Sequence, residues 1–343
     1  MVTRTALRMP HEAAAHARTW MAWPSADYLR GGASAPLAEV LAAWAGVANA
    51  LAGFEPVAML VAPGLRAEAR RHLSSAVELL DADYDDAWLR DSGPTFVVGD
   101  DGLAAVDWVF NAWGGFDGAG HTRDDLVARD VAGRAGAAVI DSPLVNEGGG
   151  IHVDGEGTVL VTDTVQLDPR RNPGWTREGV EEELARTLGA TTAIWLPRGL
   201  TRDYGPLGTR GHVDMVASFP EPGRVLLHRQ LDGSHPDAAV TASLRALLQE
   251  ATDARGRRFE IVELPAPEVL RDADGWVDYT YVNHALGNGG VVACSFGEPA
   301  DDRAAGILRD VYPGRDVVTV DARAIFAHGG GIHCITQQQP ALP

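Results

Sequence analysis

One cysteine of this sequence stands where a reactive thiol is expected. Cys334 follows the glycine-rich stretch GGGIH and precedes the polar run ITQQQ. Glycines let the backbone turn with positive φ and approach a ligand closely, so this thiol is expected at the surface of a cleft. A nearby charge that lowers its pKa would make it a nucleophile. The alternative, a buried structural cysteine, fits Cys294 in the apolar run VVACSF.

A histidine and an aspartate are separated by one residue in GTRGHVDM. If this segment is extended, His212 and Asp214 share one face, because side chains alternate along a strand. The imidazole would then serve as a general acid and base, and the carboxylate would bind a cation. Such a pair also ligates metals. However, no C-x-x-C, H-E-x-x-H or calcium-loop pattern supplies further ligands, so no metal is predicted.

Carboxylates are concentrated in the stretch DYDDAWLRDSGPTFV. Asp85, Asp86 and Asp91 are candidates for lining a cation pocket, with the Trp88 ring packed against a planar cation. The alternative is ordinary turn chemistry, in which an aspartate before Ser-Gly-Pro caps the chain locally. Glu147 precedes the first of two GGGIH copies and is a further candidate, since a carboxylate accepts hydrogen bonds from imidazole or guanidinium N–H groups.

Together these residue types match one kind of chemistry, hydrolysis at a guanidinium carbon. A cysteine, a histidine and several carboxylates each stand beside a turn that contains glycine. The substrate carbon is already cationic, so no oxyanion hole is needed. Carboxylates must instead hold the N–H groups and orient the planar carbon towards a thiolate.

The composition limits the partners. The formal net charge is −18, from 47 acidic and 29 basic residues. Nucleic acid is excluded, because its binding depends on Lys and Arg that neutralise phosphates. The acidic balance permits a small cationic substrate, although acidic surfaces more often serve solubility alone. No apolar run reaches 18 residues, so no membrane partner is expected, and the two cysteines and the absence of a recognisable secretory signal predict a cytoplasmic location.

The elements that must position these residues alternate between strand and helix. Apolar runs bounded by Gly, Pro or Asp predict strands at 56–63, 95–100, 137–141, 158–163, 224–229 and 290–296. Apolar residues at three- and four-residue spacing predict helices at 36–54, 123–136, 176–189, 236–253 and 301–314. This alternation predicts an α/β fold. No linker divides the chain, so a single domain over 1–343 is expected.

The motifs resemble those of the agmatine deiminases, a guanidine-modifying family related to the peptidylarginine deiminases. The matching stretches follow in order along nearly the whole chain: WMAWPS (20–25), DDAWLRDSGPTF (85–96), NAWGGF (111–116), EGGGIHVDGEGT (147–158), RRNPGW (170–175), TRGHVDM (209–215) and GGGIHCITQQQP (329–340). The resemblance implies a pseudo-fivefold symmetric α/β propeller of ββαβ-type repeats. The two GGGIH copies would then be equivalent turns of two repeats, which suits their separation of 181 residues (329 − 148).

The resemblance also implies a role for each candidate residue. Cys334 would be the nucleophile and His212 the general acid and base. Asp91 and Asp214 would clamp the guanidinium, and Glu147 would orient the histidine and contact the substrate. Agmatine would yield N-carbamoylputrescine and ammonia through a thiouronium adduct, with no metal or organic cofactor. An aromatic wall at Trp88 and a further carboxylate at Asp85 would complete the pocket.

Four positions depart from the family pattern at the pocket rim. Gly331 and Met215 stand where the family commonly has Asn, Phe116 where it often has Lys, and Val165 where it has Cys. The catalytic residue types are all present, so the substrate tail is less defined than the reaction. Arginine, peptidyl-arginine or another guanidino compound is the main competing substrate, and an amidinotransferase differs only in whether an amine resolves the adduct.

The far end of the pocket bears on which substrate tail is accepted. A substrate carboxylate would need a cation there, and Arg170 and Arg171 in PRRNPGW are available for it. Two different classes of protein also fit the residue types: a guanidinium- or polyamine-binding module without catalysis, and a metal hydrolase that uses His212 and Asp214. Family members are often dimeric or higher, so a homodimer or larger homo-oligomer is possible.

Overall fold

Five sheets that share one order of strand pairing dominate the fold. The computed structural model describes residues 7–24, 35–115 and 121–342, and within them it contains five sheets of three or four strands and one two-stranded hairpin. In hydrogen-bonded order the sheets are β4 (Thr95–Gly99), β5 (Gly102–Val109) and β6 (Ala138–Val145); β7 (Ile151–Val153), β8 (Thr158–Thr162) and β9 (Thr192–Leu196); β10 (Ala217–Glu221), β11 (Arg224–Arg229) and β12 (Glu260–Pro265); β15 (Ala285–Gly287), β16 (Gly290–Ser295) and β17 (Asp316–Asp321); and β18 (Gln337–Pro340), β1 (His16–Ala22), β2 (Val57–Val61) and β3 (Val77–Asp81). Each sheet begins with an antiparallel pair, and the next strand adds in parallel. The hairpin joins β13 (Arg271–Asp272) and β14 (Gly275–Trp276).

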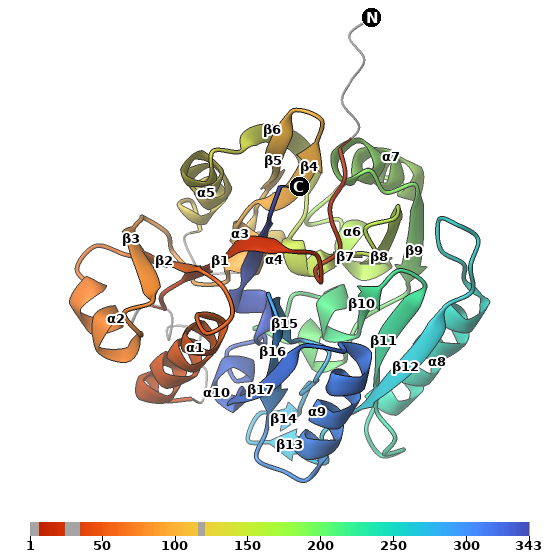
Figure 1. Ribbon diagram of the computed structural model, residues 1–343. Coiled ribbons are helices and arrows are strands. Elements are labelled where there is room, and N and C mark those ends of the chain that lie inside the picture. The colour runs from red at the N-terminus through yellow and green to blue at the C-terminus, as the bar shows by residue number, and fades with distance from the viewer. Residues whose placement is uncertain (1–6, 25–34, 116–120, 343) are drawn as a thin grey trace, which may run out of the picture.

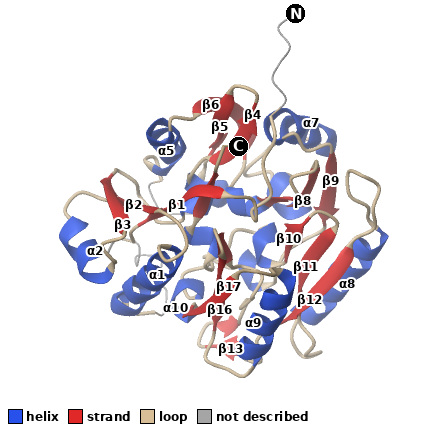
Figure 2. Ribbon diagram, in the orientation of Figure 1, coloured by secondary structure: helices blue, strands red, loops and turns tan. Residues whose placement is uncertain are grey.

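The longer helices cover the outside of these sheets. Figure 1 shows the five sheets placed around the middle of the molecule, and Figure 2 shows the long helices at its periphery. The helices are α1 (Leu37–Leu51), α2 (Arg66–His72), α3 (Leu89–Ser92), α4 (Ala112–Gly115), α5 (Val127–Ala135), α6 (Asp163–Gln166), α7 (Arg177–Leu188), α8 (Asp237–Glu250), α9 (Ala300–Val311) and α10 (Arg323–Phe326). Among the described residues, no helix combines the length and the apolar character that crossing a membrane requires.

Local sequence explains where these elements begin and end. All five residues of β2, VAMLV, are buried, as expected for a parallel strand that is covered on both faces. Helix α7 starts after Thr176, whose side chain accepts a hydrogen bond from the Gly179 N–H, and it ends at Gly189 with φ +70°. These are the usual cap residues at the two ends of a helix.

The predicted strands and helices are confirmed, but the extended conformation considered for the segment of His212 and Asp214 is wrong. Each of the six predicted strands and five predicted helices overlaps an observed one; the helix predicted at 123–136 is α5, preceded by a 3-10 turn at Asp124–Leu126. However, the segment that carries His212 and Asp214 is not a strand. His212 is followed by a 3-10 turn at Val213–Met215, because the chain must bend sharply between Gly211 and β10. The departure at Phe116 lies outside the described residues.

The fifth sheet joins the two ends of the chain. Strand β18, next to the C-terminus, pairs antiparallel with β1, which in turn pairs in parallel with β2. The indole N–H of Trp20 on β1 donates to Gln339 Oε1 on β18 at 2.9 Å. Residues just before β1 therefore meet the turn that precedes β18, and that turn carries Cys334.

Candidate active site

Cys334 lies in a short 3-10 turn, His333–Ile335, between the second GGGIH copy and β18. Its side chain is buried, with 4% of the residue exposed, so the thiol lies deeper than the cleft surface predicted from the sequence. The Asn283 side-chain amide donates to Sγ at 3.2 Å, and the Gly331 N–H approaches it at 3.5 Å. Asp214 Oδ2 lies 3.5 Å from the same sulfur. The thiol is therefore held between hydrogen-bond donors and a carboxylate.

Glycines make this turn possible because neighbouring groups fill the space of any side chain. Gly329 has φ +100°, and a Cβ there would lie 2.3 Å from the Leu207 carbonyl oxygen. A Cβ on Gly330 would lie 2.7 Å from the Trp88 ring. Trp88 thus packs directly on the turn that carries the thiol, as its predicted place in the pocket wall requires.

The charge around Cys334 keeps its thiol protonated when no ligand is bound. Burial raises the pKa of the thiol well above its ordinary value, and the carboxylates of Asp214 and Asp91 raise it further. A thiolate is favoured only when a positive charge enters between the sulfur and these carboxylates, because that cation offsets their effect.

His212 is held by carboxylates on two sides. Its Nε2 lies 3.2 Å from Glu147 Oε2, and its Nδ1 lies 3.8 Å from Asp91 Oδ1. Asp203 fixes the loop behind it by accepting hydrogen bonds from the N–H groups of Gly211 at 2.6 Å and His212 at 3.0 Å. Burial lowers the pKa of the imidazole, but the charges of Asp91 and Glu147 outweigh burial and raise it to about 9. His212 is therefore an imidazolium near neutral pH, ready to give up a proton.

Glu147 is fixed by a buried arginine. The Arg171 Nε donates to Glu147 Oε1 at 2.9 Å, and both side chains are fully buried. Burial opposes ionisation of Glu147, but Arg171 and His212 together lower its pKa to about 2. Glu147 therefore stays ionised and orients the imidazole. Arg171 has its own partners, Glu147 and Asp168, so it is not free to receive a substrate carboxylate.

Asp91 is the carboxylate whose charge is least compensated. Its Oδ2 accepts from the Trp113 indole N–H at 2.9 Å, and its Oδ1 accepts from the Gly149 N–H at 3.0 Å. Burial raises its pKa, and although His212 lowers it, the neighbouring carboxylates bring the net value to about 6.

Asp214 is held from behind by a chain of buried charges. His333 Nδ1 lies 2.8 Å from Asp214 Oδ2, and His333 Nε2 lies 2.9 Å from Glu12 Oε1. Arg90 also pairs with Glu12, at 3.2 Å. Because both ring nitrogens face carboxylates, His333 carries both protons. Burial opposes this charge, but Glu12 and Asp214 together raise the pKa of His333. The resulting imidazolium helps to lower the pKa of Asp214 against burial.

Gly149, in the first GGGIH copy, explains how the candidate groups come so close. A Cβ on Gly149 would lie 2.5 Å from His212 Nδ1, 2.9 Å from Asp91 Oδ1 and 3.1 Å from Asp214 Oδ2. Three side chains from two segments thus converge beside one glycine. Among the described residues, Asp214 Oδ1 is buried without a hydrogen-bond partner and is available to accept from a ligand N–H group. His212 Nδ1 is also without a partner, but on the imidazolium it carries a proton that it can donate.

The structure brings together Cys334, His212, Glu147, Asp91, Asp214 and Trp88. It gives the other acidic candidates different partners. The Asp85 carboxylate accepts from the Arg123 N–H at 2.9 Å and lies 3.1 Å from Arg123 Nε. Asp86 caps the Ala87 N–H at 2.7 Å, which is the ordinary turn chemistry that also fits this stretch. Neither contact directs these two carboxylates towards Cys334.

Several residues of the site carried little or no signal in the sequence. Asn283 bridges the Cys334 sulfur and the His333 N–H, yet the run TYVNHAL contains no recognisable motif. Glu12 and Arg90 reach the site only through the pairing of β18 with β1 and the packing of α3. His333 is the histidine of the second GGGIH copy, so the repeated motif was a signal, but its role depends on Glu12.

Glu12 and His333, together with His152, also have the geometry of a metal site. Ligand atoms of Glu12, His152 and His333 lie within 4.8 Å of one another. However, both nitrogens of His333 already face carboxylates, and His152 Nδ1 accepts from the Phe219 N–H at 3.2 Å, which leaves its proton on Nε2. Arg90 adds a positive charge beside Glu12. These contacts use the ligand atoms, so the cluster is a hydrogen-bond network rather than a set of free metal ligands.

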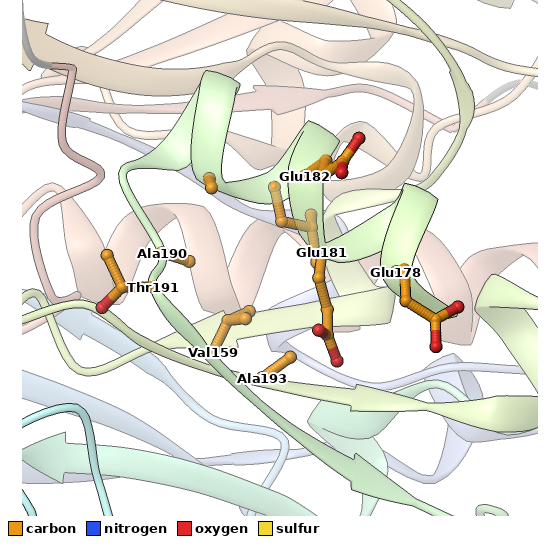
Figure 3. Close-up of a pocket in the computed structure, with 9 residues that line it drawn as sticks. Val159, Glu178, Glu181, Glu182, Ala190, Thr191 and Ala193 are labelled. Carbon is orange, nitrogen blue, oxygen red and sulfur yellow. The ribbon is translucent and has the colours of Figure 1, made fainter. Parts of the chain in front are cut away.

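A separate hollow lies beside α7. It measures about 300 Å³ and lies between α7 and the strands β8 and β9. Figure 3 shows Glu181 extending from the helix towards Ala193, while Glu182 points away. The Glu181 carboxylate accepts from the Trp195 indole N–H at 2.7 Å. The candidate catalytic residues do not line this hollow, so it plays no part in the site.

Known proteins share this arrangement over the full length of the chain. The model of the Porphyromonas-type peptidyl-arginine deiminase family matches residues 8–340. A Streptomyces coelicolor protein named "Putative agmatine deiminase" is 59% identical over 97% of this chain and 98% of its own length. The agmatine deiminase of Stutzerimonas stutzeri is 42% identical over 97% of this chain and 95% of its own. A structure of the agmatine deiminase of Enterococcus faecalis superposes with a TM-score of 0.91 at 30% identity, covering 99% of this chain and 98% of that one. Because the family model matches residues 8–340 and these relatives cover nearly the whole chain, the chain belongs to the Porphyromonas-type peptidyl-arginine deiminase family, alongside the agmatine deiminases.

Proposed function

We propose that this chain hydrolyses the guanidinium group of agmatine to N-carbamoylputrescine and ammonia, with Cys334 as the nucleophile. The observation that carries the proposal is the convergence of Asp91, Asp214 and His212 beside Gly149, with the Cys334 sulfur 3.5 Å from Asp214. Two buried carboxylates suit a planar cation with several N–H groups, and the His212 imidazolium beside them can supply a proton. Relatives at 40% identity or more that are named agmatine deiminases support agmatine as the substrate.

In the first half of the reaction, the substrate activates its own nucleophile. A guanidinium held by Asp91 and Asp214 offsets the charges that keep Cys334 protonated, so the thiol releases its proton to solvent as the substrate binds. The thiolate sulfur then forms a bond to the guanidinium carbon. As the carbon–nitrogen bond breaks, the electron pair leaves with the nitrogen, and His212 donates a proton so that ammonia departs.

In the second half, water releases the product. His212, now neutral and still oriented by Glu147, takes a proton from a water molecule that attacks the same carbon. The carbon–sulfur bond breaks and its electron pair returns to Cys334 as a thiolate, which takes the remaining proton of the new oxygen. The oxygen stays on the carbon as the carbonyl of a ureido group. No electron is gained or lost overall, so the residues named here suffice without a metal or an organic cofactor.

The proposal includes the architecture and the setting. We take the five sheets with their common pairing order to be the repeats of a pseudo-fivefold propeller, and residues 1–343 to be one catalytic domain. The two GGGIH copies support this assignment, since one follows Glu147 and the other precedes Cys334. A cytoplasmic location is proposed from the two cysteines, both of which are free.

The test compares the wild-type protein with Cys334→Ala on agmatine and, separately, on arginine. Released ammonia is measured with a chelator present. We expect turnover of agmatine and a loss of at least about a thousandfold in the variant. Turnover of arginine or peptidyl-arginine instead would transfer the mechanism to the competing substrate, and inhibition by the chelator would contradict the metal-free mechanism.

A further inference from the structure

A large cavity lies beside the turn that carries Cys334. It measures about 600 Å³ and is formed by three segments, residues 201–208, the end of the β13–β14 hairpin, and residues 326–329 of α10 and the glycine turn. In Figure 1 the hairpin lies beside α10. The mechanism proposed above uses none of the side chains that line this space.

One carboxylate in the cavity wall lacks the partners that a buried charge requires. Asp278 is 5% exposed, and its Oδ1 is buried without a hydrogen-bond partner among the described residues. Burial, together with the charge of Asp203, raises the pKa of Asp278 to about 7, although the nearby Arg202 lowers it. A buried carboxyl with an unused oxygen is stabilised by a ligand that brings a positive charge and N–H donors.

The remaining charges of the cavity favour a cation. Arg202 also lines it, but its guanidinium is bound to Asp272 at 2.7 Å and lies 3.8 Å from Asp274. Asp274 lines the cavity as well. Arg202 is one positive charge set against three carboxylates, Asp272, Asp274 and Asp278, so acidic groups outnumber it at the cavity. The rings of Trp276 and Phe326 form apolar parts of the wall, which suit methylene groups.

The cavity lies next to residues that hold Cys334 and His212 in position. Gly329 lines it, and the Phe326 ring lies 2.9 Å from where a Cβ of Gly331 would be; the Gly331 N–H in turn approaches the Cys334 sulfur. On the other side, Asp278 acts electrostatically on Asp203, which holds the backbone of His212. The cavity therefore lies against the segments that hold Cys334 and His212.

We propose that the cavity binds the ammonium end of the guanidino substrate, with Asp278 as its principal charge partner and Asp274 as a second. This inference rests on the proposed deimination and assigns the residues that choose the tail. An alkyl tail that ends in an amine meets two carboxylates and apolar walls. A tail that ends in a carboxylate, as in arginine, meets charges of its own sign, while Arg202 is already engaged. The cavity thus selects amines.

The test measures binding rather than turnover. The Cys334→Ala protein is titrated by calorimetry with agmatine and with butylguanidine, which has the same guanidinium and four-carbon tail but no amine. We expect agmatine to bind about tenfold or more tightly, as one charge-assisted hydrogen bond provides. Adding Asp278→Asn should lower the affinity for agmatine by about tenfold and change the affinity for butylguanidine by less than about twofold.

Two further variants complete the test. Asp274→Asn, at a half-exposed position, should lower the affinity for agmatine by a smaller factor of about two to three and leave the affinity for butylguanidine unchanged. Glu182→Gln removes one exposed carboxylate from the hollow on α7 and should change neither affinity. Equal affinities of the parent for the two compounds, or equal losses of both on Asp278→Asn, would overturn the ammonium site. If agmatine binds through Asp278 but the wild-type protein releases no ammonia, the proposed deimination fails and the ammonium site stands.

Discussion

At the scale of single residues, the indole of Trp113 helps to set the pH at which Asp91 becomes charged. Burial raises the pKa of Asp91, and the Trp113 N–H, which donates to its carboxylate, is one of the contacts that limit the net value to about 6. Below this pH, Asp91 is neutral and cannot clamp a cation, so kcat/KM should fall as the pH drops through 6. Trp113→Phe removes the donor, so this acid limb of the profile, the fall of kcat/KM at low pH, should move about one pH unit higher, as the loss of a hydrogen bond to a charged group implies. The measurement is the pH profile of kcat/KM.

The surface provides a matched control for this substitution. Trp195→Phe removes a similar indole donor from Glu181, outside the site. Its pH profile should coincide with that of the wild type. A limb that stays at the same pH in Trp113→Phe would show that Asp91 is not the group that titrates.

Glu12 is a positioning residue that acts on Asp214 through His333. Glu12→Gln removes the charge that stabilises the His333 imidazolium, so Asp214 should become protonated more easily. We expect kcat/KM to fall about tenfold and the acid limb to become steeper, because two carboxyls then titrate there. Glu55→Gln disrupts a comparable buried pair with His16 and should affect stability while leaving the profile unchanged. An unaltered slope in Glu12→Gln would contradict the role of this chain.

At the scale of elements, the glycine turn beside His212 is built for close approach. In Gly149→Ala the added Cβ would lie 2.5 Å from His212 Nδ1 and 2.9 Å from Asp91 Oδ1, so one of these groups must move. We expect activity to fall about a hundredfold, as displacements near 1 Å can cause. Gly133→Ala on α5 meets nothing within 4 Å and should leave activity intact while stabilising the helix slightly. Equal activities of the two variants would refute this account of the turn.

The same scale shows what could be predicted from the sequence and why the rest could not. Strand β2, VAMLV, is uniformly apolar, and β8, TVLVT, is apolar at its centre; every residue of both is buried, and this pattern is easily recognised. Strand β18 reads QQQP and carries no such signal, since its burial depends on pairing with β1. The candidates Cys334, His212 and Glu147 were identified because they stand in glycine-containing motifs. Glu12 and Asn283 stand in none, and only the fold brings them to the site.

At the scale of the molecule, the site depends on the chain ends being joined. Strand β18 pairs with β1, and this pairing places Glu12 behind the turn that carries Cys334. A chain that stops after Thr336 keeps every candidate catalytic residue but loses β18. It should lose roughly 3 kcal/mol or more of unfolding free energy, because several strand hydrogen bonds disappear and the Trp20 indole N–H is left without its partner.

This truncation tests whether the sheets form one cooperative unit. If residues 1–343 are a single domain, thermal unfolding followed by circular dichroism should show one transition at a lower temperature, with deiminase activity lost along with it. A chain that stops after Pro340 retains β18 and should behave almost as the full chain does. If the chain ending at Thr336 remained fully active, Cys334 would be held by its local turn alone. Loss of activity in only the shorter chain would show that the junction of first and last strands holds the nucleophile in place.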